Sequence, residues 1–220
     1  MKNILNNIDT LIFDMDGTLI DSMGIWRKID EEFFANHNMP FPNDLLKNID
    51  GFSFDETADY FLNTYKFPYT KDEIKNIWHN MSFEYYRDKI PYKTGALEFL
   101  KEMKRRGLKM GMATSNSREL TDAIDSRLHF SEYITEIVTN NEVPHGKPEP
   151  DIFLLAAKRL NSAPNNCLVF EDITGGILAG KRAGMKVCAL HDEFSMMMDD
   201  DKRRLSDYYI NDYFDILNLL

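Results

Sequence analysis

The sequence predicts an α/β fold in which a parallel sheet has helices on both faces and carries an inserted helical domain. Two apolar runs, Leu11-Ile12-Phe13 and Leu168-Val169-Phe170, are short and followed by acids, as expected of buried central strands. From Thr94 onward, strand patterns alternate with helical patterns, which is typical of βαβ crossovers. Between these parts, helical spacing without β-branched runs indicates an insert. The predicted core is therefore Rossmann-like.

The predicted domains are a core formed by residues 1–20 and 93–220 and a small α-helical cap formed by residues 21–92. Prolines separate three groups of side chains in the insert that recur at helical intervals: Ile25, Ile29, Phe33 and Phe34; Thr57, Tyr60, Phe61 and Thr64; Ile74, Ile77, Trp78, Met81 and Tyr85. Both tryptophans, Trp26 and Trp78, lie in this insert. We expect them to fill its small core rather than to contact substrate.

The second part of the chain gives a regular series of predicted elements. Helices are expected at about 94–106, up to 128, 151–160, from Gly175 to Gly184, and 213–219; strands are expected at 108–113, 134–139, 168–170, 186–190 and 208–210. The Met- and Asp-rich segment 196–201 interrupts this series, and we expect it to be a mobile surface loop.

Composition limits the classes of function. A chain of 220 residues with 43% hydrophobic content can bury a sizeable core. Its formal net charge of -10 argues against nucleic acid or anionic membranes as partners, because both require a positive surface. Cys167 and Cys188 lie in apolar runs and are expected to be buried thiols. No signal peptide or membrane-spanning segment is recognisable, so a cytoplasmic protein without an obligate protein partner is expected.

Two acids, Asp14 and Asp16, directly follow the first strand and are followed by Gly17 and Thr18. Residues two apart on an extended backbone point their side chains the same way. Neighbouring carboxylates repel each other, so they require a cation or a shared proton. A divalent metal ion is the simplest solution.

Other polar groups follow later strands. Thr114, Ser115 and Asn116 come after one strand, and Glu171 and Asp172 after another, with Lys147 in the sequence Gly146-Lys147-Pro148 between them. If these strands are parallel neighbours, their ends meet in one crevice. Four carboxylates there favour Mg²⁺, whereas Lys147 and the Thr114-Ser115-Asn116 turn would bind phosphate.

These four signals, in this order, resemble the motifs of the haloacid dehalogenase-like (HAD) superfamily. The first is Asp14-Met15-Asp16-Gly17-Thr18, the second Thr114-Ser115-Asn116, the third Lys147 and the fourth Glu171-Asp172. The similarity covers nearly the whole core and implies the subgroup with a small helical cap after the first motif. The cap itself matches only in its place and helical character.

The resemblance implies a role for each residue. Asp14 would be the nucleophile that forms an aspartyl-phosphate, and Asp16 would protonate the leaving oxygen and later activate water. Mg²⁺ would be bound by Asp14, the backbone carbonyl of Asp16 and Asp172, with Glu171 contributing through water. Lys147 would pair with Asp14 and the phosphate.

The resemblance also leaves alternatives open. An acid at position 16 favours phosphoester chemistry over the dehalogenase and phosphonatase reactions of the superfamily. The substrate would be a small phosphorylated metabolite, with sugar phosphates among the candidates. A phosphatase is preferred to a β-phosphoglucomutase-like enzyme, because Phe54 stands where the mutase pattern carries an arginine, although Lys47 or Arg27 could replace that cation. A third hypothesis is a catalytically silent HAD-fold binding or regulatory protein, suggested by the unusual cap and by Ile173, where the family usually has serine.

Overall fold

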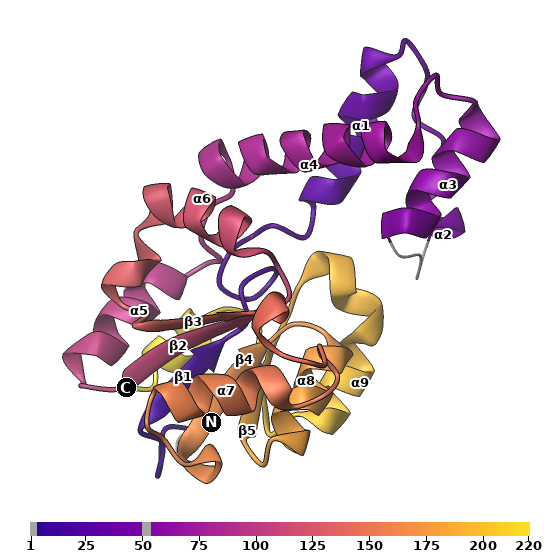
Figure 1. Cartoon of the computed structure of the whole chain (residues 1–220). Helices are drawn as coiled ribbons and strands as arrows, with labels where there is room; N and C mark the ends of the chain where they lie inside the picture. Colours follow the sequence, from indigo (N-terminus) through magenta and orange to yellow (C-terminus); the bar gives the residue numbers. More distant parts are fainter. Residues whose placement is uncertain (1–3, 50–53) are drawn as a thin grey trace. The chain divides into compact units, whose positions relative to one another are not determined.

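The computed structural model describes residues 4–49 and 54–220, except the side chains of 46, 47 and 54–56 (Figure 1). The chain divides into two compact units. One is formed by Met1–Met23 together with Ile90–Leu220, and the other by Gly24–Lys89. The predicted domain limits, 20/21 and 92/93, remain a prediction.

The first unit is built on a single parallel sheet, as predicted (Figure 1). Its six strands are β1 (Thr10–Phe13), β2 (Lys109–Thr114), β3 (Glu136–Thr139), β4 (Cys167–Glu171), β5 (Lys186–Leu190) and β6 (Tyr208–Ile210). Their order is β3-β2-β1-β4-β5-β6, and every pairing is parallel. The order reverses beside β1, where connections leave the sheet in opposite directions. Sheets of this type bind ligands at that point, beyond the carboxyl ends of the strands.

Helices cover both faces of the sheet, because alternate side chains of each strand point to opposite sides. On one face, Ile12 and Val169 belong to a buried cluster with side chains of α7 (Asp151–Arg159) and α8 (Thr174–Arg182). On the other face, the rings of Phe13 and Phe170 stack at 5.0 Å, and Phe99 of α5 (Ala96–Arg105) packs against both. The remaining helices of this unit are α6 (Arg118–Leu128), α9 (Asp199–Leu205) and α10 (Phe214–Leu217), with 3-10 turns η1 (Phe130–Glu132), η2 (Asn140–Glu142), η3 (Pro164–Asn166) and η4 (Glu193–Met198).

The second unit is helical, as its apolar spacing predicted. It contains α1 (Ile25–Asn36), α2 (Leu45–Asn48), α3 (Phe54–Tyr65) and α4 (Lys71–Asp88). Its core is largely aromatic and includes Phe33, Phe61 and Trp78, whose rings contact one another edge-on. Trp78 is buried, as expected, but Trp26 is 42% exposed. The expectation that Trp26 fills this core was therefore wrong: in α1 the buried positions are taken by Ile25, Ile29, Asp30, Phe33 and Phe34.

Segment 196–201 is not a loop. It lies within η4 and α9. The residue that follows it, Lys202, is fully buried. Three acids, Asp199, Asp200 and Asp201, occupy the first turn of α9, and basic residues follow. This order suits the dipole of a helix, which favours negative charge at the start and positive charge at the end. The composition of the segment, rich in Met and Asp, suggested a loop, but this order of charges favours a helix.

Cys167 and Cys188 are both free thiols and buried, as predicted. Within residues 4–49 and 54–220, no helix combines the length and apolar character needed to cross a membrane.

Candidate active site

The predicted polar residues meet where β1, β2 and β4 end. β1 lies between β2 and β4, with Phe13 in register with Met112 on one side and Phe170 on the other. The backbone N–H of Asp14 donates to the carbonyl of Phe170 at 3.0 Å, which carries the pairing one residue past the strand. The acids after β1 and β4 are therefore held side by side by the sheet itself.

Lys147 joins these two strand ends. Its ammonium group donates to Oδ1 of Asp14 at 2.6 Å and to Oε1 of Glu171 at 2.7 Å. Its side chain is only 5% exposed. Burial disfavours the charged amine, but the negative charges of Asp14 and Glu171 outweigh this effect and raise the pKa of Lys147. Lys147 is therefore a fixed positive charge inside an otherwise acidic site.

Three carboxylates, those of Asp14, Glu171 and Asp172, form a buried cluster in which one oxygen of each lies within 4.8 Å of one oxygen of both others. Burial raises the pKa of Glu171 to about 7, against the lowering effect of Lys147, and burial together with the charges of Glu171 and Asp14 raises the pKa of Asp172. Oδ2 of Asp172 is buried and has no hydrogen-bond partner. An oxygen-only donor set with excess negative charge and one unsatisfied buried oxygen fits a hard divalent cation.

Two glycines leave room for the oxygens of this cluster. A Cβ atom at Gly17 would lie 2.3 Å from Oδ2 of Asp172, and one at Gly176 would lie 1.7 Å from Oε1 of Glu171. Gly17 also has a φ of +75°, which disfavours other residues. Glycine is needed at both positions because the carboxylates occupy the space of a side chain.

Asp16 has a separate set of partners. Its Oδ1 accepts a hydrogen bond from the Ser22 hydroxyl at 2.7 Å, and its Oδ2 accepts one from Nδ2 of Asn116 at 3.2 Å. The Asp16 side chain is not part of the three-carboxylate cluster. The two acids of the first motif therefore have different surroundings, although the sequence suggested that their side chains point the same way.

Thr114 is the last residue of β2, and Ser115 and Asn116 continue the chain into the turn that follows. The buried Thr114 hydroxyl accepts a hydrogen bond from the N–H of Asn116 at 3.0 Å, so it shapes the turn. Ser115 is exposed. The next residue, Ser117, is the N-cap of α6 and accepts from the N–H of Leu120. Only Asn116 of this motif is linked to the acidic residues, through Asp16.

Three hydroxyl groups that were not predicted as site residues form hydrogen bonds with the acids. Thr18 donates to Oδ1 of Asp172 at 3.1 Å, and Ser195 donates to the carbonyl oxygen of Asp172 at 3.0 Å. The third is Ser22, the partner of Asp16. Thr18 lies within the first motif, which is a usable signal. Nothing local marks Ser195, because it belongs to the segment around 196–201. Ile173 has no hydroxyl group with which to bind these acids. Its backbone N–H instead donates to Oε2 of Glu171 at 3.3 Å.

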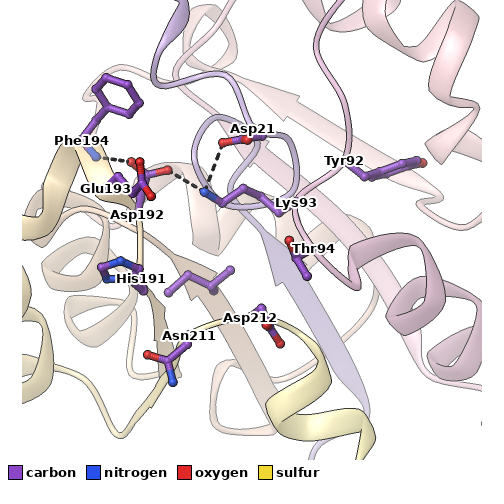
Figure 2. A pocket seen from close by; sticks show the side chains of 11 residues that line it. Asp21, Tyr92, Lys93, Thr94, His191, Asp192, Glu193, Phe194, Asn211 and Asp212 are labelled. Atoms are coloured by element: carbon purple, nitrogen blue, oxygen red, sulfur yellow. Dashed lines mark hydrogen bonds and ion pairs between the residues drawn. The ribbon is translucent and has the colours of Figure 1, made fainter.

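A pocket of about 330 Å³ lies in the same unit but is lined by other residues (Figure 2). Lys93 crosses it and pairs with the buried Asp192 at 2.6 Å and with Asp21 at 3.3 Å. None of the eight predicted site residues lines this pocket. Its connection to the acidic cluster is electrostatic, since the charge of Asp192 contributes to the raised pKa of Asp172, after burial and the nearer acids Glu171 and Asp14.

The choice between phosphatase and mutase was argued partly from two cap residues, Phe54 and Lys47. Residues 50–53 lie outside the described residues, and so do the side chains of Phe54 and Lys47. The preference for a phosphatase that rests on Phe54 and Lys47 therefore remains a prediction.

The sheet order and the acidic cluster define a class of α/β enzyme with a polar site at the carboxyl edge of its strands. Residues 11–190 match the family described as haloacid dehalogenase-like hydrolase. The chain belongs to this family, as the four motifs predicted.

Curated relatives are named as phosphatases and a mutase. The chain is 33% identical over 192 residues to a bifunctional riboflavin kinase/FMN phosphatase of Arabidopsis thaliana, covering 86% of this chain but 50% of the plant protein. It is 28% identical to a phosphorylated carbohydrates phosphatase of Thermotoga maritima, covering 81% and 83% of the two chains. It is 30% identical to the β-phosphoglucomutase of Bacillus subtilis, with 80% of each covered.

The fold is also found in solved structures. A HAD family IA hydrolase from Entamoeba histolytica superimposes with a TM-score of 0.75 at 21% identity, covering 94% of this chain and 95% of that one. Membership of this hydrolase family, together with the phosphatases among the curated relatives, makes the chain an enzyme of the phosphoric monoester hydrolases. These relatives support this class over a catalytically silent binding protein.

Proposed function

We propose that the protein is a Mg²⁺-dependent phosphatase that hydrolyses a small phosphomonoester through an aspartyl-phosphate on Asp14. The observation that carries the proposal is the different setting of the two acids of the first motif. Asp14 lies in a buried cluster with Lys147, Glu171 and Asp172, whereas Asp16 is hydrogen-bonded to Ser22 and Asn116. A nucleophile and a proton carrier need such different environments.

Asp14, Asp172 and the backbone carbonyl of Asp16 would hold the ion, with Glu171 acting through water. When bound, Mg²⁺ supplies positive charge that offsets the repulsion between Asp14 and the substrate phosphate. The unsatisfied Oδ2 of Asp172 supports this assignment. Mg²⁺ is preferred because the donor set consists of oxygens and such ions also coordinate phosphate oxygens.

In the first step, the Asp14 carboxylate attacks phosphorus and the bond between phosphorus and the ester oxygen breaks. Asp16 gives its proton to the leaving oxygen, so that a neutral alcohol departs. In the second step, Asp16 takes a proton from water as the water oxygen attacks phosphorus. The bond between Asp14 and phosphorus then breaks, and inorganic phosphate and the free carboxylate are restored.

Lys147 and the turn Thr114-Ser115-Asn116 would bind the transferred phosphate. In an enzyme with a net charge of -10, a phosphate site needs local positive charge. Lys147 provides it as a buried ammonium next to the nucleophile. Thr114 keeps the turn in shape through the N–H of Asn116, and Ser115 is exposed for contact.

A sugar phosphomutase is the second candidate. The 30% identity to the β-phosphoglucomutase of Bacillus subtilis favours it, and the phosphatase relative of Thermotoga maritima, which is named for phosphorylated carbohydrates, points to the same substrate class. Both reactions share the phosphorylated Asp14. They differ only in whether water or a sugar hydroxyl accepts the phosphate.

One set of assays tests both. Hydrolysis of p-nitrophenyl phosphate is measured with Mg²⁺ and with a chelator, for wild type, Asp14→Asn, Asp16→Asn and the exposed control Asp122→Asn. The proposal predicts metal-dependent turnover that both site variants lose and the control keeps. Turnover that is unaffected by the chelator or by Asp14→Asn would refute it. Conversion of β-glucose 1-phosphate to the 6-phosphate without phosphate release would identify a mutase.

A further inference from the structure

Asp172 directly follows β4, whose last residue is Glu171. The pairing of β4 with β5 ends at Glu171, which is in register with Ala189. Thr18 donates to Oδ1 of Asp172, and the backbone N–H of Asp172 donates to Oε2 of Glu171 at 3.0 Å, but neither bond reaches its carbonyl oxygen. The bond to its carbonyl oxygen comes from Ser195 of η4, 23 residues further along the chain. The metal-binding acid therefore depends on a segment outside all four motifs.

The direction of the Ser195 hydroxyl is set by Lys202. The Lys202 ammonium donates to Oγ of Ser195 at 3.0 Å, and an ammonium group can only donate. Ser195 must therefore accept this bond, and its single proton is left for the carbonyl of Asp172. Both residues are buried, with exposures of 2% and 0%, so water does not compete for these bonds.

Lys202 is itself fully engaged. Its ammonium also donates to the carbonyl of Leu190, the last residue of β5, at 3.2 Å, and lies 2.8 Å from Oδ1 of Asp199. One buried charge thus ties together the end of β5, η4 and α9. A lysine removed from water costs free energy unless it is paired, and Asp199 supplies the opposite charge for Lys202.

We propose that Ser195, oriented by Lys202, is a positioning residue that fixes Asp172 for metal binding. The inference rests on the proposed function, because it assumes that Asp172 is a metal ligand. Its physical basis is that a ligand held in place before the ion arrives loses less freedom on binding. Loss of the Ser195 hydroxyl should weaken metal binding without removing any ligand.

The test uses Mn²⁺, whose binding to the full-length protein is measured by electron paramagnetic resonance, without any substrate. Ser195→Ala should weaken Mn²⁺ binding about tenfold. The matched control is Ser82→Ala, since Ser82 is equally buried and also donates to a backbone carbonyl, that of His79 at 2.8 Å. Ser82→Ala should change Mn²⁺ affinity by less than about twofold. Thermal unfolding of the metal-free variants separates a change in stability from a change in affinity.

Lys202→Gln provides the second arm. It should weaken Mn²⁺ binding in the wild-type background, but not in the Ser195→Ala background, because Lys202 acts through Ser195. Unchanged affinity in Ser195→Ala, an equal loss in Ser82→Ala, or additive losses in the double variant would overturn the inference. Should Ser195→Ala not fold, Lys202→Gln with unchanged affinity would overturn it. A wild-type protein that binds no Mn²⁺ would instead refute the proposed metal site.

Discussion

The ammonium group of Lys147 lies 2.6 Å from Oδ1 of Asp14, although the two residues are 133 positions apart in the sequence. The same group binds Glu171, so one lysine neutralises part of a cluster of three buried acids. This contact links the expected nucleophile to the fourth motif. Charge therefore holds together parts of the site that are far apart in the sequence.

Lys147→Met should therefore damage both stability and catalysis. It leaves the carboxylates of Asp14 and Glu171 buried without their cation, which should cost about 3–5 kcal/mol. Loss of a charge beside the transferred phosphate should lower kcat by at least about 100-fold. The control Lys181→Met removes a lysine from the half-exposed pair with Asp207 and should cost less than about 1 kcal/mol. Urea unfolding and steady-state kinetics check both; equal effects of the two variants would contradict the prediction.

Two adjacent glycines of α8 should differ sharply. A Cβ at Gly176 would lie 1.7 Å from Oε1 of Glu171, whereas a Cβ at Gly175 would meet nothing within 4 Å. Gly176→Ala must displace Glu171 and should cost about 1–3 kcal/mol. Gly175→Ala should stay within about 1 kcal/mol of wild type, since alanine favours the helix. Thermal unfolding measures both, and a Gly176→Ala protein as stable as Gly175→Ala would contradict the close approach.

Mg²⁺ should stabilise the folded protein. Binding to the folded state alone, at about 100 times the dissociation constant, adds about 2.7 kcal/mol. Asp172→Asn should remove this effect and at the same time stabilise the metal-free protein, because burial and neighbouring acids disfavour the Asp172 charge and raise its pKa. Unfolding temperatures with Mg²⁺ and with chelator test both. The exposed Asp122→Asn serves as control; a Mg²⁺ effect that persists in Asp172→Asn would argue against this ligand.

The helical unit should contribute its own pH dependence. Burial raises the pKa of Asp30 from 3.8 to about 7, with a smaller contribution from Glu31. Between these values the folded state binds more protons than the unfolded state, so stability should fall as the pH rises from about 4 to about 7. The loss should be on the order of 4 kcal/mol.

Asp30→Asn stays neutral and should flatten this part of the stability profile, raising stability at pH 8. The exposed Glu84→Gln in α4 should leave it unchanged. Urea unfolding at several pH values is the measurement. An Asp30→Asn variant with the same slope as wild type would show that Asp30 is not the group responsible.

The sequence alone determined the sheet, its strands and the positions of the acids at their ends. Apolar runs and the acids after them are local patterns, and β1 and β4 follow from such patterns directly. The helical insert followed in the same way from its apolar spacing. The four family motifs could be recognised from the types and the order of their polar residues, because the same reaction requires the same functional groups.

The tertiary structure decided how these residues are held. Asp14 and Asp16 are two positions apart, but one lies against Lys147 and the other against Ser22 and Asn116. Trp26 is exposed while Trp78 is buried, although both occur in amphipathic helices. The contact of Ser195 with Asp172 depends on η4, whose second half falls in the segment 196–201 that was expected to be a loop. Partners and burial arise from packing between distant segments, and no local pattern records which side chains that packing brings together.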